Sequence, residues 1–526
     1  METISAALLG LAQSAGGRPL VTVDGHELGW AEFARQVRHL AARLAAQLDG
    51  QPQPVRVALV LPNSVHWYPL FYAISSVGAI PVPLDPQIGA WEIERVFGLL
   101  EIGLAFVAES YKRNPILEQV RAYAQTHTGL RRIVVVEPSS AGLTGNFPAQ
   151  SVCTLMDFLS GPTGELPNDW PSPLAAESVL MLATTSGTTG NPKILEVPHR
   201  GFRKAQQDMA DYLGFRASDR MLVGMPLYHQ GGFGMGLQMA LAGGSLYYQS
   251  LFDPREFLRL VETERISVLQ LTATLAKILL STPGFADFDL GSLRMVYFAG
   301  ERLPAELAAE FSGRLGLRVI NVIGSSETAT MVVYDSAVPG ETDSNVFRRL
   351  PFTQIRLVDA TGDAVAVGEI GALLVHTDAL ILGYFGNQAE TALRLSTVDG
   401  QSWFNTGDLG RKIDADHIEF TGRSKRIIKR GANLIHPEEV EAFFLTHPDI
   451  AAIAVCGQPH EVMGEMLIAH IQPKPGALIS QADLMGFARG RIAAYKIPDR
   501  LNITPQIPLD IGKVQFKYLD QSGGRA

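Results

Sequence analysis

The strongest constraint on the fold is an alternation of short apolar runs with segments of helical period. Apolar runs at Val55–Leu61 and Arg294–Phe298 have strand length, whereas Val65–Val77 and Asp253–Thr263 have the spacing of buried helix faces. Strands that alternate with helices indicate mostly parallel sheets covered by helices on both faces. The same pattern predicts further strands at Ala79–Leu84, Ile133–Val136, Ser178–Ala183, Arg220–Met225, Val268–Leu271 and Arg318–Val322, and a helix at Ala305–Leu315.

The pattern changes past about Pro351, where short alternating runs replace the buried ones. Phe352–Asp359, Gly368–Thr377 and His417–Thr421 predict antiparallel strands in a small barrel-like part. The last ~100 residues predict a compact mixed unit of helices and strands. Its predicted elements are a helix at Pro437–Leu445, strands at Ile450–Gly457 and Met466–Gln472, and a helix that begins at Ser480.

Composition limits the class of protein. With 46% hydrophobic and 18% charged residues, the chain of 526 residues can bury sizeable cores. The net charge of −9 argues against a dedicated nucleic-acid binder, which usually carries a basic balance. The two cysteines, Cys153 and Cys456, are too few for a disulfide framework or a cysteine-based zinc site. A reducing compartment is the simpler interpretation, and we expect a cytoplasmic protein.

Two long stretches, 57–84 and 221–252, contain no Asp, Glu, Lys or Arg. Prolines interrupt the first, and glycines, glutamines and His229 interrupt the second, so neither offers the ~20 clean apolar residues of a spanning helix. The N-terminus also lacks the positive segment of a signal peptide. We therefore expect buried core elements and no integral membrane segment.

The strongest local signal is the segment from Thr184 to Lys193, which follows the strand at Val179–Ala183. It combines hydroxyl groups, glycines and one lysine, which are the donors that polyphosphate oxygens need in close quarters. It is not the usual P-loop, because Lys193 is followed by Ile194 and not by Ser or Thr. A flexible polar loop after a strand is the alternative.

The same segment resembles the phosphate-binding loop of the AMP-forming adenylating enzymes, the superfamily of acyl-CoA synthetases, peptide-synthetase adenylation domains and luciferases. Four further motifs of that superfamily follow in the right order, so the resemblance spans nearly the whole chain. They are the Tyr-Gly-x-Thr-Glu-like segment Asn321–Thr328, the Thr-Gly-Asp segment Trp403–Asp408, the hinge-like segment Gly422–Lys425, and the Gly-Lys segment Pro508–Val514.

The resemblance implies an α/β protein with two units. Residues 1–424 would form a large N-terminal adenylation domain, and residues 425–526 a small mobile α+β domain that turns about a hinge at Lys425. The implied reaction joins a carboxylic acid to ATP with release of pyrophosphate, and then passes the acyl group from the adenylate to coenzyme A. The alternatives are transfer to the phosphopantetheine thiol of an acyl or aryl carrier protein, and a degenerate paralogue that only binds nucleotide.

The resemblance also assigns an ATP site. Glu327 would bind Mg²⁺, which offsets phosphate charge. Asp408 would contact the ribose, Arg423 the ribose or a phosphate, Ser326 the α-phosphate, and Gly300 and Glu301 the adenine. The phosphate loop would contribute Thr185, Ser186, Gly187, Thr188, Thr189, Gly190 and Lys193. Ile323 stands where the superfamily usually has an aromatic residue beside the adenine.

Lys513 is the residue expected to catalyse adenylation, because a cation between the carboxylate and the α-phosphate stabilises both as charge redistributes. His229 would gate the carboxylate position, although a buried, hydrogen-bonded histidine is the alternative. Gln230 stands near the place where amino-acid-activating relatives carry an aspartate, which disfavours an amino-acid substrate. The expected acyl pocket consists of His229, Gly232, Gly234, Phe298, Ala299 and Val322.

Two departures from the superfamily leave the acceptor open between coenzyme A and a carrier protein. Arg430-Gly431 stands where Gly-Gly is common, and Arg426 stands where an acidic residue is common. Both lie on or near the 429–433 face, which would line the thiol tunnel in the second pose of the small domain.

Overall fold

The structure is a computed structural model. It describes residues 3–50, 54–138, 152–166, 168, 170–171, 178–185, 193–300, 303–341, 346–359, 361–423, 428–431, 433–504, 507, 509–510 and 513–514, with backbone only at 185, 422, 423, 434, 438, 509, 510, 513 and 514.

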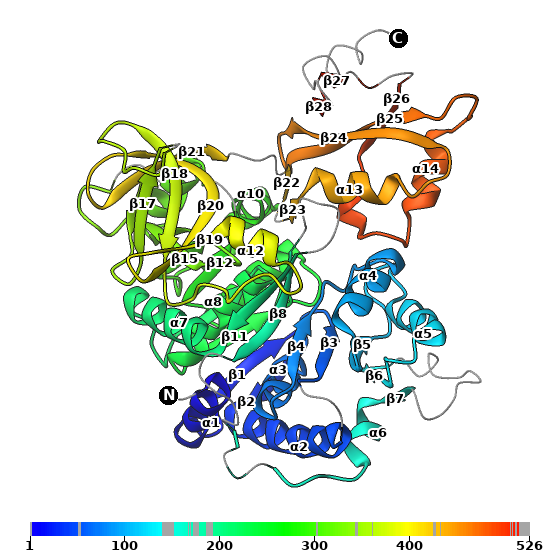
Figure 1. Ribbon diagram of the computed structural model, residues 1–526. Helices are drawn as coiled ribbons and strands as arrows, with labels where there is room; N and C mark the ends of the chain where they lie inside the picture. The colour runs from blue at the N-terminus through cyan, green and yellow to red at the C-terminus, as the bar shows by residue number, and fades with distance from the viewer. Residues whose placement is uncertain are drawn as a thin grey trace.

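The largest sheet crosses the middle of the molecule (Figure 1). Its described strands, in spatial order, are β17 (Gln354–Val358), β18 (Ile370–His376), β20 (Gln401–Lys412), β21 (His417–Arg423), β16 (Val346–Arg349), β15 (Ala329–Asp335), β14 (Arg318–Ser325), β13 (Met295–Phe298), β12 (Val268–Leu271), β10 (Arg220–Val223), β11 (Ser245–Tyr248), β1 (Pro19–Val23) and β2 (His26–Gly29), with β19 (Leu395–Val398) beside β20.

This sheet has two halves of different character. From β14 to β1 all neighbouring strands are parallel, as the alternation of strands and helices predicts. From β14 to β17 they are antiparallel, and this end curls in Figure 1 into the small barrel-like part. The pairing changes from parallel to antiparallel at the β14–β15 hairpin, and Glu327 lies in the turn of this hairpin.

A second sheet is parallel throughout and forms the lower part of Figure 1. Its strands are β4 (Ile80–Pro83), β3 (Arg56–Val60), β5 (Leu104–Ala108), β6 (Arg132–Val136) and β7 (Val152–Thr154). Strands β3, β5 and β6 are almost entirely buried, which explains their continuous apolar runs.

The helices of the large part lie around these sheets. They are α1 (Ile4–Ala15), α2 (Trp30–Leu48), α3 (Trp67–Ser76), α4 (Ala90–Leu100), α5 (Ile116–Thr126), α6 (Leu155–Ser160), α7 (His199–Leu213), α8 (Gln230–Leu241), α9 (Pro254–Thr263), α10 (Ala273–Leu280), α11 (Ala305–Ala309) and α12 (Gln388–Arg394). The helix predicted at Ala305–Leu315 continues past α11 as a π-helical turn, Glu310–Arg314. No helix among the described residues is long and apolar enough to cross a membrane.

The strand predicted at Ser178–Ala183 differs in its pairing from the parallel pattern. It forms β8 (Val179–Thr185), which pairs antiparallel with β9 (Lys193–Pro198), and Thr185 is opposite Lys193. The phosphate-loop segment therefore connects two strands of a hairpin. The segment 382–385 follows β9 closely, because the Leu382 N–H donates to the Glu196 carbonyl at 2.8 Å and the Phe385 N–H to the Ile194 carbonyl at 2.8 Å.

The C-terminal part has its own sheet and its own apolar core. The strands are β23 (Asn433–Ile435), β22 (Ile428–Arg430), β25 (Gly464–Pro473), β24 (Ile450–His460) and β26 (Arg500–Ile503), with helices α13 (Pro437–Phe444) and α14 (Gln481–Ala488). A short hairpin of β27 (Leu509–Asp510) and β28 (Lys513–Val514) lies at its outer end in Figure 1. The predicted α/β fold with a small α+β part is thus confirmed.

An aromatic cluster joins α3 to α8 beneath the active-site region. The Phe233 ring of α8 lies 4.5 Å from the Phe71 ring and 5.3 Å from the Trp67 ring, measured between centroids. Phe202 of α7 stacks on Phe233 at 5.9 Å. Since all four side chains are buried, this cluster fixes the position of α8.

Replacement Phe233→Ala is expected to destabilise the protein by about 3–5 kcal/mol, because it leaves a cavity among packed rings. The thermal midpoint should fall by several degrees, and calorimetry measures it. Met156→Ala, at a side chain that is 79% exposed, is the control and should leave the midpoint unchanged. Equal midpoints for the two variants would show that the cluster does not stabilise the fold.

Candidate active site

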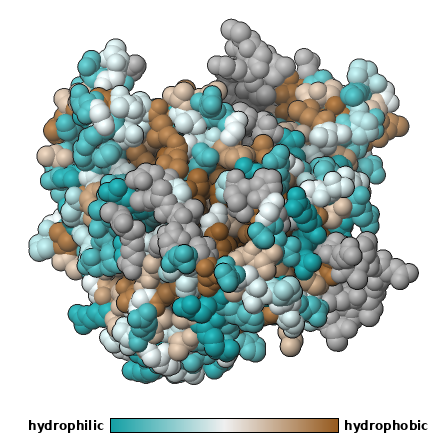
Figure 2. Space-filling view, turned by 60° about the horizontal axis from the view of Figure 1, so that its bottom comes forward, coloured by the Kyte–Doolittle hydropathy of each residue, from teal (hydrophilic) through white to brown (hydrophobic). Residues whose placement is uncertain are grey.

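A cavity of about 360 Å³ lies where the large part and the C-terminal part meet. Its walls come from α4, α7, α8, the β14–β15 hairpin and β20, and from the C-terminal segments that follow β22 and α14. In the turned view of Figure 2, hydrophobic residues gather toward the middle of the face between largely hydrophilic flanks.

The cavity brings together most of the described residues that the sequence assigns to the site. Those that line it are Lys193, His229, Gly234, Ala299, Gly300, Val322, Ser326, Glu327 and Asp408. Gly232 and Phe298 are beside it but do not line it: an added Cβ on Gly232 would meet the Pro226 carbonyl at 2.2 Å, and Phe298 packs edge-on against Phe311.

Several predicted residues fall outside the described part of the chain. Ser186, Gly187, Thr188, Thr189, Gly190, Glu301 and the hinge residue Lys425 are not described, and Thr185, Arg423 and Lys513 are described by backbone alone. Their roles stay predictions.

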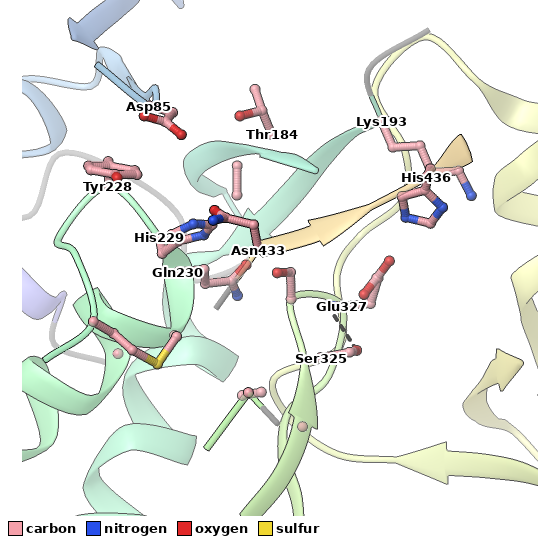
Figure 3. A pocket seen from close by; sticks show the side chains of 18 of the residues that line it. Asp85, Thr184, Lys193, Tyr228, His229, Gln230, Ser325, Glu327, Asn433 and His436 are labelled. Atoms are coloured by element: carbon pink, nitrogen blue, oxygen red, sulfur yellow. Dashed lines mark hydrogen bonds between the residues drawn. The ribbon is translucent and has the colours of Figure 1, made fainter. Parts of the chain in front are cut away.

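Glu327 projects into the cavity from the turn between β14 and β15 (Figure 3). The Tyr384 hydroxyl donates to Glu327 Oε1 at 3.0 Å, and the Glu327 N–H donates to Ser325 Oγ at 3.2 Å. Burial raises the pKa of Tyr384, and the nearby carboxylate raises it further, so the phenol stays protonated as the donor. One oxygen of Glu327 is thereby oriented, while the group remains accessible from the cavity.

Lys193 is the first residue of β9. Its side chain forms an ion pair with Glu390 of α12, in which Nζ lies 2.5 Å from Oε1. Both side chains are about nine-tenths buried, and Arg394 binds the same Oε1 at 3.2 Å. Burial raises the pKa of Glu390, but Lys193 and Arg394 outweigh it and leave the pKa below its ordinary value. The Lys193 ammonium also lies 5.2 Å from the centre of the Tyr384 ring.

Glu327 and Lys193 could together hold a magnesium-bound polyphosphate. Among the described residues no cluster of three or more His, Cys, Asp or Glu could bind a metal ion by itself. A site with Glu327 as a carboxylate ligand suits Mg²⁺, which usually keeps waters and takes phosphate oxygens as its other ligands. Lys193 and Arg394 also line the cavity and could supply cations for the phosphates.

Asp408 lies within β20 and not in a turn. Its side chain is buried, its N–H donates to Thr406 Oγ1 at 3.0 Å, and it lines the cavity. Gly407 before it has a φ of 75°, a conformation that favours glycine. A carboxylate held this way can accept two hydrogen bonds from a vicinal diol.

His229 precedes α8 and stands opposite Glu327 across the cavity, beside Tyr228 and Asp85 (Figure 3). Burial lowers the pKa of His229 and the Asp85 carboxylate partly offsets this. Burial likewise raises the pKa of Asp85, although a hydrogen bond from the Gln87 N–H at 2.8 Å and the nearby His229 oppose it.

One face of α8 lines the cavity and includes Gly234 of the predicted acyl pocket. Gly231, Gly234 and Gln238 are three and four residues apart, so they share that face. Gln238 donates to Gln206 Oε1 at 2.8 Å, and both side chains are buried. An added Cβ on Gly234 would lie 3.3 Å from Gln206, so the missing side chain preserves space next to this amide pair.

The C-terminal part contributes Asn433 and His436 to the cavity (Figure 3). The departure at Arg430 has a structural explanation: its guanidinium donates to the carbonyls of Tyr495 at 2.7 Å and Ile497 at 3.0 Å, and pairs with Asp499. Arg430 thereby fixes the β22–β23 hairpin to the segment that follows α14.

Sequence reasoning missed Tyr384, Glu390, Arg394 and Asp85. The first three belong to a stretch with no strand alternation and only a short helix, and their relation to Lys193 arises from the pairing of β9 with 382–385. Asp85 follows a predicted strand, and a polar residue at the carboxyl end of a parallel strand is a signal that could have identified it.

Comparison with known proteins agrees with this geometry. The family model "AMP-binding enzyme" matches residues 11–385, and the model "AMP-binding enzyme C-terminal domain" matches residues 439–511. A feruloyl-CoA synthase of an Amycolatopsis species is 30% identical over 92% of this chain and 91% of its own. An indoleacetate–CoA ligase of Aromatoleum aromaticum is 26% identical over 95% of this chain and 94% of its own.

Solved structures show the same fold. The amide bond synthetase McbA from Marinactinospora thermotolerans has a TM-score of 0.81 at 22% identity, covering 99% of this chain and all of its own. The anthranilate CoA ligase AuaEII, solved with anthranoyl-AMP, has a TM-score of 0.71 at 23% identity, covering 99% of this chain and 97% of its own.

The chain therefore belongs to the AMP-binding enzyme family, which is the superfamily that its motifs resemble. The predicted class of enzyme, an AMP-forming acid–thiol ligase of the acyl-CoA synthetase type, is confirmed. It activates a carboxylic acid with ATP as an acyl-adenylate and then transfers the acyl group.

Replacement Tyr384→Phe removes one oxygen, the donor to Glu327, and retains the ring beside Lys193. Because hydrogen bonds to charged groups contribute about 1.5–3 kcal/mol, we expect the KM for magnesium-ATP to rise about tenfold in a pyrophosphate-release assay. Tyr212→Phe removes a hydroxyl bonded to Arg348 away from the cavity and serves as the control. A KM equal to that of the control would exclude an orienting role for Tyr384.

Proposed function

We propose that this enzyme joins a compact, ring-bearing carboxylic acid to coenzyme A. The observation that carries the proposal is that one cavity holds the phosphate-binding Lys193, the carboxylate Glu327, part of the predicted acyl pocket beside α8, and residues of the C-terminal part. A single site can thus bind ATP and the acid and admit a thiol.

In the first step, the residues of this chain bind and orient two anions. Lys193 and Arg394 would take the outer phosphates, Asp408 the ribose, and Glu327 the magnesium ion that neutralises the phosphates. Lys513 would approach the carboxylate and the α-phosphate, as the Gly-Lys motif implies. His229 borders the junction of the predicted acyl pocket with the phosphate site and would exclude water there.

The proposed acid class follows from the side chains that line the α8 side of the cavity. The Gln206–Gln238 pair and the buried ring of Phe202 line it there, and we infer that they favour a compact acid over a long alkyl chain. The feruloyl and indoleacetate ligases among the relatives act on ring-bearing acids by name. Gln230 and the glycines that follow it again disfavour an amino acid, since its ammonium would lack an acidic partner on α8.

Coenzyme A is the proposed acceptor because the curated relatives are coenzyme A ligases by name. Arg430, the first departure that left the acceptor open, makes contacts within the C-terminal part and does not argue for another thiol. A carrier protein is the second candidate. Cys153 and Cys456 form no disulfide in the described structure, which fits the cytoplasmic location that the sequence predicts.

The two steps would use two arrangements of a large unit, 1–424, and a small unit, 425–526, with Lys425 as the hinge. Support comes from the sheets, because β21 ends in the large sheet at Arg423 and β22 begins in the C-terminal sheet at Ile428. Asn433 of the β22–β23 hairpin lines the cavity, whereas β28 lies at the outer end of the C-terminal part in Figure 1. This arrangement suits thiol transfer.

Replacement Lys513→Ala should lower the rate of acid-dependent pyrophosphate formation by about a hundredfold or more, because a charge that stabilises the transition state is lost. Conversion of purified acyl-adenylate and coenzyme A to the thioester should stay within about threefold of wild type, since that step uses the other arrangement. Lys474→Ala, at an exposed lysine of the same part, is the control. Adenylation at the wild-type rate would refute the assignment.

A panel of acids tests the substrate class. We expect kcat/KM with benzoate-, cinnamate- and indoleacetate-like acids to exceed that with long unbranched alkanoates by about tenfold or more, because Phe202 and the Gln206–Gln238 pair line the α8 side of the cavity. Thioester formation measured with free coenzyme A and with a phosphopantetheinylated carrier protein at equal concentration tests the acceptor. Preference for a long alkanoate would overturn the acid class, and preference for the carrier would overturn the acceptor.

A further inference from the structure

The first turn of α4 contacts the C-terminal part through its backbone. The N–H groups of Ala90 and Trp91 donate to the carbonyls of Gly490 and Arg491 at 3.2 and 3.1 Å. The first N–H groups of a helix have no partner within it, so the C-terminal backbone completes the hydrogen bonding of α4. The Trp91 ring packs edge-on against Phe443 of α13 at 5.4 Å.

Glu92 connects the same turn to a buried ammonium group. Its Oε2 accepts from the N–H groups of Gly89 and Ala493 at 2.9 and 2.8 Å, and its Oε1 lies 2.5 Å from Lys496 Nζ. Lys496 also binds Glu439 Oε1 of α13 at 2.6 Å. Thus one ammonium of the C-terminal part is shared by a carboxylate of its own part and a carboxylate of the large part.

All three charged side chains are more than nine-tenths buried. Burial alone would lower the pKa of Lys496, but Glu439 and Glu92 raise it well above its ordinary value, so the lysine is charged. When the two parts separate, Lys496 keeps Glu439 as its partner, whereas Glu92 loses both the ammonium and the Ala493 N–H and must be solvated by water. The Glu92–Lys496 pair therefore exists only while the two parts are in contact.

Gly89 permits this contact by having no side chain. An added Cβ would lie 2.2 Å from the Arg491 carbonyl carbon and 2.3 Å from its oxygen, which are backbone atoms that cannot turn aside. The backbone of Gly89 is extended, with φ −94° and ψ 167°, so any residue could adopt its conformation. The requirement for glycine here comes from the neighbouring part and not from the local chain.

The contact also determines which face of the C-terminal part meets the cavity. With residues 490–496 on α4, Asn433 and His436 line the cavity and β28 is at the far end of the C-terminal part (Figure 1). A rotation of the C-terminal part that brought β28 to the cavity would carry residues 490–496 away from α4.

We propose that Gly89 and Glu92, with Lys496, form a docking contact specific to the thiol-transfer arrangement, and that they are positioning residues for the second half-reaction. The proposal rests on the proposed function, in which the two half-reactions use different arrangements. These residues act through the position of the C-terminal part and not on the reacting atoms. Adenylation, which uses the other arrangement, does not need them.

Replacements Gly89→Ala and Glu92→Gln test the proposal in the full-length enzyme. The first half-reaction is followed as a single-turnover burst of pyrophosphate without coenzyme A, and the second as thioester formation from purified acyl-adenylate. We expect both variants to lose at least tenfold in the second step and to stay within about twofold of wild type in the first. Gly98→Ala, on the same helix, is the control, because its added Cβ would meet only the Tyr123 hydroxyl at 3.9 Å.

Equal losses in both steps, in variants with unchanged thermal midpoints, would overturn the proposal by showing a role that does not depend on the arrangement. Two wild-type steps in Gly89→Ala would also overturn it, since the close approach would then be dispensable. A different result would refute the proposed function itself. If the wild-type enzyme forms the adenylate but no coenzyme A thioester, coenzyme A is not the acceptor, whatever the variants do.

Discussion

The active site depends on the backbone pairing between β9 and the segment 382–385. The same segment bonds to the turn of the β14–β15 hairpin, because the Ile381 N–H donates to the Glu327 carbonyl at 3.0 Å. Without this pairing, Tyr384 could not reach both Lys193 and Glu327, which belong to different sheets. A few main-chain hydrogen bonds therefore align the cation and the carboxylate of the site.

Much of the architecture could be predicted from the sequence for a simple physical reason. Strands buried on both faces must be apolar throughout, so β3, β12 and β13 stand out as uninterrupted runs, and their bounds agree with the prediction to within a residue or so. The hairpin of β8 and β9 was not foreseen, because a strand followed by a polar loop has the same local pattern whether a helix or a second strand comes next.

The residues of the site likewise include some that the sequence could predict and some that it could not. Glu327, Asp408 and Lys193 were found because motifs fix their spacing along the chain, and the cavity contains all three. Glu390 and Arg394 could not be predicted from the sequence, because their role depends on ion pairs with residues that are distant in sequence or not part of a motif. Arg430 shows the reverse case, in which a departure from a motif reflects contacts with Tyr495 and Ile497.

The hydrogen bonds that complete the first turn of α4 make the contact between the two parts measurable by amide hydrogen exchange. The amide hydrogens of Ala90 and Trp91 are bound to carbonyls of the C-terminal part and not to their own helix. Each separation of the two parts exposes these hydrogens to solvent, where they exchange, while the hydrogens deeper in α4 stay protected. The exchange rate at these two positions thus records how much of its time the enzyme spends with its two parts joined.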